Sequence, residues 1–210
     1  LSTLEAGLAM REKLLENQRK FYRDALALAD KHPVKAYIFT EPEDNGRLSE
    51  FIRILKVHRI KVYKTVKDIT RDGITYKSQS SYIVPLRKDE YRFARSLFEP
   101  VTNFSDSIFY DVSTWVLPMS FNLKYAPLMQ SKEIEGLIGP EITEAPKQSG
   151  QLISPDKPYA YLFEWTDYYA PKALYRLQEK GLITRVSGEG FTCLAGNVKR
   201  TFAAGTIVIP

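Results

Sequence analysis

Apolar residues recur in two similar patterns along this chain. Residues 34–85 begin with VKAYIFT and end with SYIVP, and residues 158–210 begin with PYAYLFE and end with TIVIP. Ala36 and Ala160 differ by 124 in number, and Pro85 and Pro210 by 125, so the two segments have nearly the same length. Two copies are too few for a solenoid, which needs about three or more repeats. The pattern therefore predicts a tandem α/β duplication.

Each copy has the pattern of a strand, a helix and a further strand. The apolar runs at 34–40 and 159–164 have strand length and are typical of strands buried on both faces. Helical patterns follow at about 46–58 and 167–180, and further strands are expected at 60–63, 82–86, 183–186, 191–194 and 206–209. Strand–helix–strand order indicates right-handed crossovers. We therefore expect an α/β fold with mostly parallel sheets and helices on their faces.

The remaining segments set the expected domain boundaries. Residues 2–31 have capping-box spacing at Ser2 and Glu5 and a broad apolar stripe, and Pro33 ends this long N-terminal helix. Residues 129–158 are rich in Gly and Pro, which favours a linker or long loop. The expected parts are therefore the helix (1–33), a first α/β unit (34–128), the linker (129–158) and a second unit (159–210). Residues 107–119 are expected to be helical up to Pro118, and we expect an excised piece whose second unit is truncated at its C-terminus.

The net charge of +5 is concentrated in one segment. Between residues 47 and 67 the only acidic residue is Glu50, against seven basic ones: Arg47, Arg53, Lys56, Arg59, Lys61, Lys64 and Lys67. A nucleic-acid-binding face has this character, but so have a solvated helix and an edge strand. No aromatic stacking pattern accompanies the patch, which disfavours nucleic acid as a partner. No apolar run approaches the roughly 18 residues of a membrane helix, so no membrane partner is expected.

The residue types of most catalytic sites are sparse. His32 and His58 stand outside any His-x-x-Glu or His-Glu-x-x-His motif, so we expect no zinc site in this chain. Cys193 has neither a downstream His nor a following helix, which favours a small buried hydrophobic side chain over a nucleophile. No glycine-rich phosphate loop follows any expected strand. The expected catalytic and metal-binding residues are therefore none, and no cofactor is expected in this chain.

The loops after the two leading strands are the remaining candidates for ligand binding. Open α/β sheets place their ligands at such strand ends. Carboxylates with aromatic residues could bind a sugar, a peptide or a cation, whereas the alternative is that Asp44 and Asp167 cap helices while the aromatic rings pack. The candidate ligand-binding residues are Glu41, Asp44, Glu164, Trp165, Asp167 and Tyr168.

Three segments resemble a known family. FYDVSTWVLPMSF (109–121), YAYLFEWTDYYAPKALYRL (159–177) and GTIVIP (205–210) are similar, in this order, to the region after the catalytic domain in large bacterial zinc carboxypeptidases of the carboxypeptidase A-like superfamily. The resemblance implies a flavodoxin-like fold of the class I glutamine amidotransferase type. It also implies a parent metallopeptidase with zinc in its own catalytic domain. That family's zinc ligands, a His-x-x-Glu motif and a later His, are missing here, so no catalytic residue carries over.

The resemblance favours a non-catalytic accessory region of a zinc metallocarboxypeptidase. The chain would pack on the parent's peptidase domain through the 2–31 helix, or present substrate to it. One alternative is a two-lobed module that binds a small molecule or peptide between the strand-end loops. A second alternative is a basic nucleic-acid-binding module at 47–67. The sequence assigns no compartment, although the resemblance is compatible with a secreted or periplasmic parent.

Overall fold

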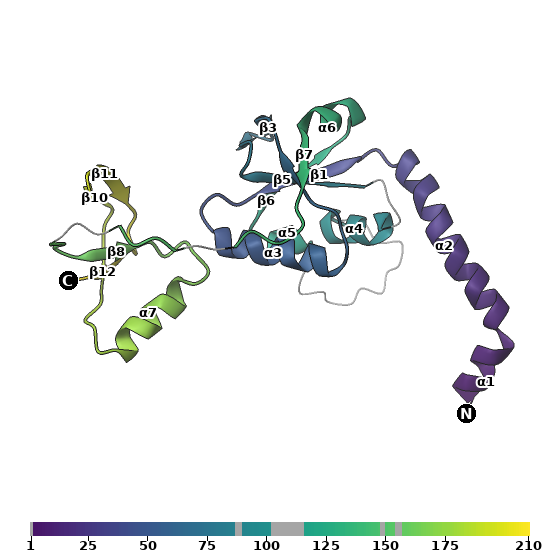
Figure 1. Ribbon diagram of the computed structural model, residues 1–210, viewed down its shortest axis with the longest axis horizontal. Coiled ribbons are helices and arrows are strands. Elements are labelled where there is room, and N and C mark those ends of the chain that lie inside the picture. Colours follow the sequence, from purple (N-terminus) through teal and green to yellow (C-terminus); the bar gives the residue numbers. More distant parts are fainter. Residues whose placement is uncertain (1, 87–89, 102–115, 148–149, 154–156) are drawn as a thin grey trace. The chain divides into compact units, whose positions relative to one another are not determined.

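The computed structural model describes residues 2–86, 90–101, 116–147, 150–153 and 157–210 (Figure 1). These residues form two compact units. Unit 1 comprises Leu1–Glu41 and Phe51–Ala145, and unit 2 comprises Pro42–Glu50 and Pro146–Pro210. The expected helix at 107–119 lies largely outside the described residues, and only its end is seen, in the short helix α5 (Leu117–Ser120).

Unit 1 is built on a five-stranded sheet. Its strands, in spatial order, are β6 (Lys124–Leu128), β1 (Ala36–Thr40), β5 (Ser81–Pro85), β2 (Tyr63–Thr65) and β7 (Ile138–Glu141). Every neighbouring pair in this sheet is antiparallel. All five residues of β1 are buried, because both faces of the sheet are covered.

Helices cover one face of this sheet with an aromatic core. Helix α3 (Asn45–Val57) follows β1, and α4 (Tyr91–Phe98) follows β5. The ring centroids of Phe39 and Phe51 lie 5.0 Å apart, and those of Phe51 and Phe98 lie 5.7 Å apart. Successive side chains of a strand point to opposite faces. Tyr37 and Phe39 are two residues apart, so both face these helices.

A hairpin and a helix cover the opposite face. The hairpin consists of β3 (Ile69–Arg71) and β4 (Ile74–Tyr76), and the helix is α6 (Ser131–Leu137). Figure 1 shows both on one side of the sheet, with α3, α4 and α5 on the other. Their shared core consists of Ala36, Ile38, Tyr76, Ile83, Ala126, Leu128, Ile134 and Leu137, and we call it the hairpin-side core.

Tyr76 carries an unpaired hydroxyl into this core. Its side chain is fully buried, and its hydroxyl has no hydrogen-bond partner among the described residues. Burial, followed by the charges of Asp72 and Tyr125, raises the pKa of Tyr76 to about 12. An unpaired buried hydroxyl destabilises the folded state by about 1–3 kcal/mol.

We therefore expect Tyr76→Phe to raise the free energy of unfolding of unit 1 by about 1 kcal/mol in urea denaturation. Tyr63→Phe is the matched control, because the Tyr63 hydroxyl forms a hydrogen bond with Glu141 and its removal should not stabilise the protein. Equal losses of stability in both variants would contradict this account of Tyr76.

Unit 2 contains a smaller sheet of three strands. β8 (Tyr161–Phe163), β12 (Ile207–Ile209) and β9 (Arg185–Val186) lie in this order, and both pairs are antiparallel. Helix α7 (Ala170–Glu179) connects β8 to β9. A hairpin of β10 (Phe191–Ala195) and β11 (Val198–Phe202) connects β9 to β12.

The two halves of the chain share one topology. Each runs strand, helix, strand, hairpin, strand, and in each the last strand lies between the first two, giving β1-β5-β2 and β8-β12-β9. The strand register is also the same. Ile38 pairs with Ile83, and Leu162 pairs with Val208, which are the same positions under offsets of 124 and 125. The two hairpins also match, because each contains a cross-strand pair of threonines. The hydroxyl oxygens of Thr70 and Thr75 lie 3.1 Å apart in one hairpin, and those of Thr192 and Thr201 lie 3.0 Å apart in the other.

The prediction of a mostly parallel sheet of the flavodoxin or class I glutamine amidotransferase type is wrong. All strand pairs among the described residues are antiparallel. β1 and β2 do run in the same direction, as a strand–helix–strand connection requires, because both are antiparallel to β5. However, β5 is inserted between them, and apolar periodicity does not specify which strands become neighbours.

Two segment assignments also change. The N-terminal region forms α1 (Ser2–Ala9) and α2 (Arg11–Lys31), so the expected helix at 2–31 is present with an interruption at Met10. Residues 129–158, expected as a linker or long loop, contain α6 and β7, and β7 pairs with β2 at the edge of the unit 1 sheet.

Candidate functional site

Asp44 is the most buried of the predicted ligand-binding residues, with 1% of its surface exposed. One carboxylate oxygen, Oδ1, accepts a hydrogen bond from the backbone N–H of Arg47 at 2.8 Å, in the first turn of α3. Oδ2 accepts one from the backbone N–H of Tyr168 at 2.8 Å and lies 3.1 Å from Nη2 of Arg47. Asp44 therefore caps α3 and ties the loop after β1 to the loop after β8 within unit 2.

The other predicted residues are spread over different environments. Oδ1 of Asp167 accepts a hydrogen bond from the backbone N–H of Tyr169 at 2.7 Å, just before α7. Trp165 and Tyr168 are exposed, and Glu164 is half-buried in the same loop. Glu41 belongs to unit 1, where it is buried. Of the predicted residues, Asp44 and Tyr168 thus lie together. The Asp44 carboxylate accepts hydrogen bonds from the backbone N–H groups of Arg47 and Tyr168.

The two histidines do not fit a zinc site. Nδ1 of His32 lies 3.1 Å from the carbonyl oxygen of Val34, and Nε2 lies 3.4 Å from a carboxylate oxygen of Glu99. His58 packs against Phe93, with ring centroids 4.8 Å apart. Among the described residues, no group of three or more His, Cys, Asp and Glu side chains is arranged to bind a metal ion.

The basic segment at 47–67 is partly engaged in ion pairs. Arg47 pairs with Asp44, as described above. Nζ of Lys56 and Nζ of Lys61 lie 3.8 and 3.4 Å from the carboxylate of Glu141 on β7. These two lysines therefore form ion pairs with a carboxylate on β7, a strand of their own unit.

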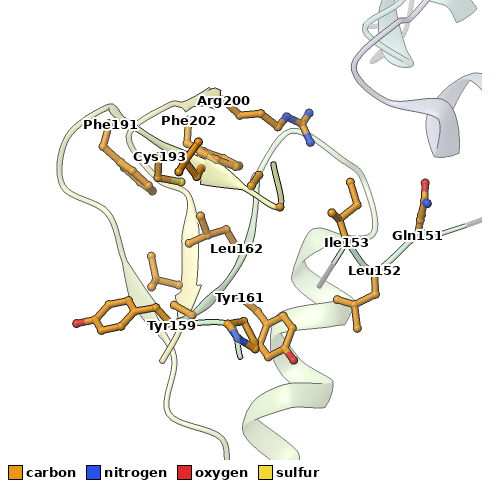
Figure 2. A pocket seen from close by; sticks show the side chains of 16 residues that line it. Gln151, Leu152, Ile153, Tyr159, Tyr161, Leu162, Phe191, Cys193, Arg200 and Phe202 are labelled. Carbon is orange, nitrogen blue, oxygen red and sulfur yellow. The ribbon is translucent and has the colours of Figure 1, made fainter. Parts of the chain in front are cut away.

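Unit 2 contains a cavity of about 430 Å³ (Figure 2). Its wall includes Phe202 and Arg200 from the β10–β11 hairpin, Leu162 from β8 and Val208 from β12. Figure 2 shows the hairpin side chains on one side and those of Leu152 and Ile153 on the other. A cavity of this size is within the range of ligand pockets, and its wall is mainly apolar.

Cys193 lines the same cavity. Its thiol is free, and the side chain is half-buried, although the sequence predicts a buried hydrophobic position. The sequence did not indicate the cavity, because its wall is assembled from four segments whose proximity depends on the strand order.

A second exposed feature is an apolar face on α1 and α2. Only Ala25 and Ala29 of these two helices are buried, and they lie in the C-terminal half of α2, which packs near α4. Large apolar side chains along the two helices remain exposed: Leu4, Leu8, Leu14, Leu15, Phe21, Tyr22, Leu26 and Leu28. The pairs at 14/15, 21/22 and 28/29 recur every seven residues, which places them on one helix face. No helix that the structure describes has the length and apolar character needed to span a membrane.

Comparisons of this chain with protein-family models, with curated proteins and with solved structures find no match.

Proposed function

We propose that this chain is a non-catalytic accessory region of a zinc metallocarboxypeptidase, and that it packs on the peptidase domain through α1 and α2. The observation that supports this proposal is the apolar face of these helices. The exposed fraction is 67% for Leu8, 65% for Leu15 and 49% for Tyr22. The resemblance of residues 109–121, 159–177 and 205–210 to the region after such a peptidase domain supplies the partner.

The energetics favour a protein as the occupant of this face. Burying apolar surface contributes about 25 cal/mol per Å², so each large side chain of the face would contribute about 1.5–3 kcal/mol when covered. Isolated helices are marginal in water, and an amphipathic helix is normally stabilised by packing of its apolar face. An amphipathic helix that lies in a groove or on a flat surface of a partner satisfies both requirements.

The test measures association of the full chain with the peptidase domain encoded by the same gene, using sedimentation and isothermal titration calorimetry. We expect saturable binding that is weakened at least about 100-fold by the double variant Leu15→Glu, Tyr22→Glu, because two charges would then be buried in an apolar interface. Both residues are exposed in the chain itself, so the variant should fold normally.

Lys20→Glu is the matched control. Lys20 lies on the opposite face of α2, and the change should leave binding within about twofold. The purified chain alone should release no C-terminal residue from a peptide. Carboxypeptidase turnover by this chain, or loss of binding that is equal in the control and the double variant, would overturn the proposal.

A further inference from the structure

The cavity in unit 2 occupies the position of a filled core in unit 1. Half of the hairpin-side core of unit 1 comes from the repeated topology, through Ala36, Ile38, Tyr76 and Ile83. The other half comes from outside it, through Ala126 and Leu128 of β6 and Ile134 and Leu137 of α6. β6 pairs antiparallel with the outer edge of β1, and α6 follows it directly in the chain.

The repeated half of this core is present in unit 2, and all of it lines the cavity. Strand register relates Ala36, Ile38 and Ile83 to Ala160, Leu162 and Val208. The threonine pairs align the two hairpins, which relates Tyr76 to Phe202. These four counterparts are Ala160, Leu162, Val208 and Phe202.

Within the residues that the structure describes, unit 2 has no strand equivalent to β6 and no helix equivalent to α6, although Leu152 and Ile153 of the segment before β8 also line the cavity. β8 pairs with β12 and with no other described strand, whereas β1 lies between β5 and β6. Helix α7 lies between β8 and β9 in the chain, so it corresponds to α3 and not to α6. The cavity is therefore the space that a β6–α6 segment fills in the equivalent unit.

The equivalent cross-strand pair of each hairpin contains an arginine, but on opposite strands: Arg71 pairs with Ile74, and Arg200 pairs with Cys193. In unit 1, Arg71 of the hairpin forms an ion pair with Glu133 of α6. In unit 2, the position of Arg71 is taken by Cys193, and its cross-strand partner is Arg200, which lines the cavity. Arg200 forms no ion pair with any described residue, and its guanidinium lies 5.9 Å from the ring centroid of Phe202. An acidic side chain would complement it.

We propose that this cavity binds an extended polypeptide segment with the chemistry of β6–α6. The segment adds antiparallel to β8, as β6 adds to β1, and its alternate apolar side chains enter the cavity over Leu162 and Val208. A carboxylate of the segment pairs with Arg200. Addition of a strand to a sheet edge, with side-chain pockets for specificity, is an established mode of peptide recognition. The site lies in unit 2 and is independent of the α1–α2 face.

The chain provides its own probe. A synthetic peptide of residues 122–139 carries the β6–α6 sequence, including Ala126, Leu128 and Glu133. Titration of the fluorescently labelled peptide with the full chain, followed by anisotropy, should show saturable binding. Amide hydrogen exchange should show new protection at residues 160–163 and 191–202 of unit 2.

Charge reversal tests the predicted pairing. Arg200→Glu should weaken peptide binding at least about tenfold, and a peptide with Glu133→Lys should bind the Arg200→Glu protein better than the original peptide does. Lys199→Glu is the matched control, because Lys199 is the exposed neighbour of Arg200 on the same strand and does not line the cavity. The control should change binding by less than about twofold.

Three results would overturn this proposal. The first is the absence of saturable binding by the peptide. The second is equal weakening by Arg200→Glu and Lys199→Glu. The third is new hydrogen-exchange protection confined to unit 1. The variant Leu15→Glu, Tyr22→Glu on α2 should bind the peptide normally, so failure of the proposed function and failure of this inference are distinguishable.

Discussion

Phe98→Ala should lower the free energy of unfolding of unit 1 by about 3–5 kcal/mol. Phe98 is fully buried at the end of α4, and its ring contacts Tyr37, Phe39 and Phe51, with centroids 4.9, 6.0 and 5.7 Å away. The substitution removes a buried aromatic ring and leaves a cavity between α3, α4 and the sheet. Urea denaturation followed by circular dichroism measures the change.

Phe93→Ala on the same helix is the control. Phe93 is 41% exposed and contacts His58 at the surface, so we expect a loss below about 1 kcal/mol. A similar loss in the two variants would show that α4 is not held to the sheet by Phe98.

Asp44→Ala should lower the free energy of unfolding of unit 2 by about 2–4 kcal/mol. The change removes the cap of α3, which contributes about 1 kcal/mol, and leaves the Arg47 guanidinium without its ion pair. It also removes the acceptor of the Tyr168 N–H, which joins the two loops. Hydrogen exchange at residues 161–177 measures the loss directly, because the loop after β8 should open more often.

Asp167→Ala is the comparison for this prediction. The Asp167 carboxylate accepts a hydrogen bond from the Tyr169 N–H in an exposed setting, so the expected loss is about 0.5–1 kcal/mol. If Asp167→Ala proved as destabilising as Asp44→Ala, the structural role assigned to Asp44 would be wrong.

The repeat is the feature of the fold that the sequence predicts best. The offsets of 124 and 125 that relate Ala36 to Ala160 and Pro85 to Pro210 also relate the strand pairs of the two sheets. Apolar alternation specifies which residues face each side of a strand, and a helix between two strands specifies their relative direction. Neither specifies that β5 is inserted between β1 and β2. The prediction of a parallel sheet assumes that β1 and β2 are neighbours, whereas β5 lies between them.

The edge strands of unit 1 resemble linkers in composition. β6 contains Pro127, and β7 contains Gly139 and Pro140. Proline is tolerated at a sheet edge, because its missing N–H can face away from the neighbouring strand. Gly139 is required by close packing, since a Cβ there would lie 2.8 Å from the carbonyl oxygen of Lys64. Residues that indicate a loop elsewhere are therefore compatible with a strand here.

The candidate sites were predictable to different degrees. The capping role of Asp44 follows from its position before a helix and is confirmed. The apolar stripe on α1 and α2 is visible in the sequence, and its exposure in the structure supports the proposed interaction surface. The cavity could not be predicted, because Leu162, Cys193 and Val208 lie on strands whose neighbours are determined by tertiary structure.

The shortness of the outer strands of unit 2 has a consequence for self-association. β8 has three residues and β9 has two, so another polypeptide that adds to either edge strand forms few main-chain hydrogen bonds. Very short edge strands are one means by which proteins avoid indiscriminate aggregation. A stable complex at either edge strand must therefore obtain its specificity from side-chain contacts. Strands of unrelated sequence should dissociate quickly.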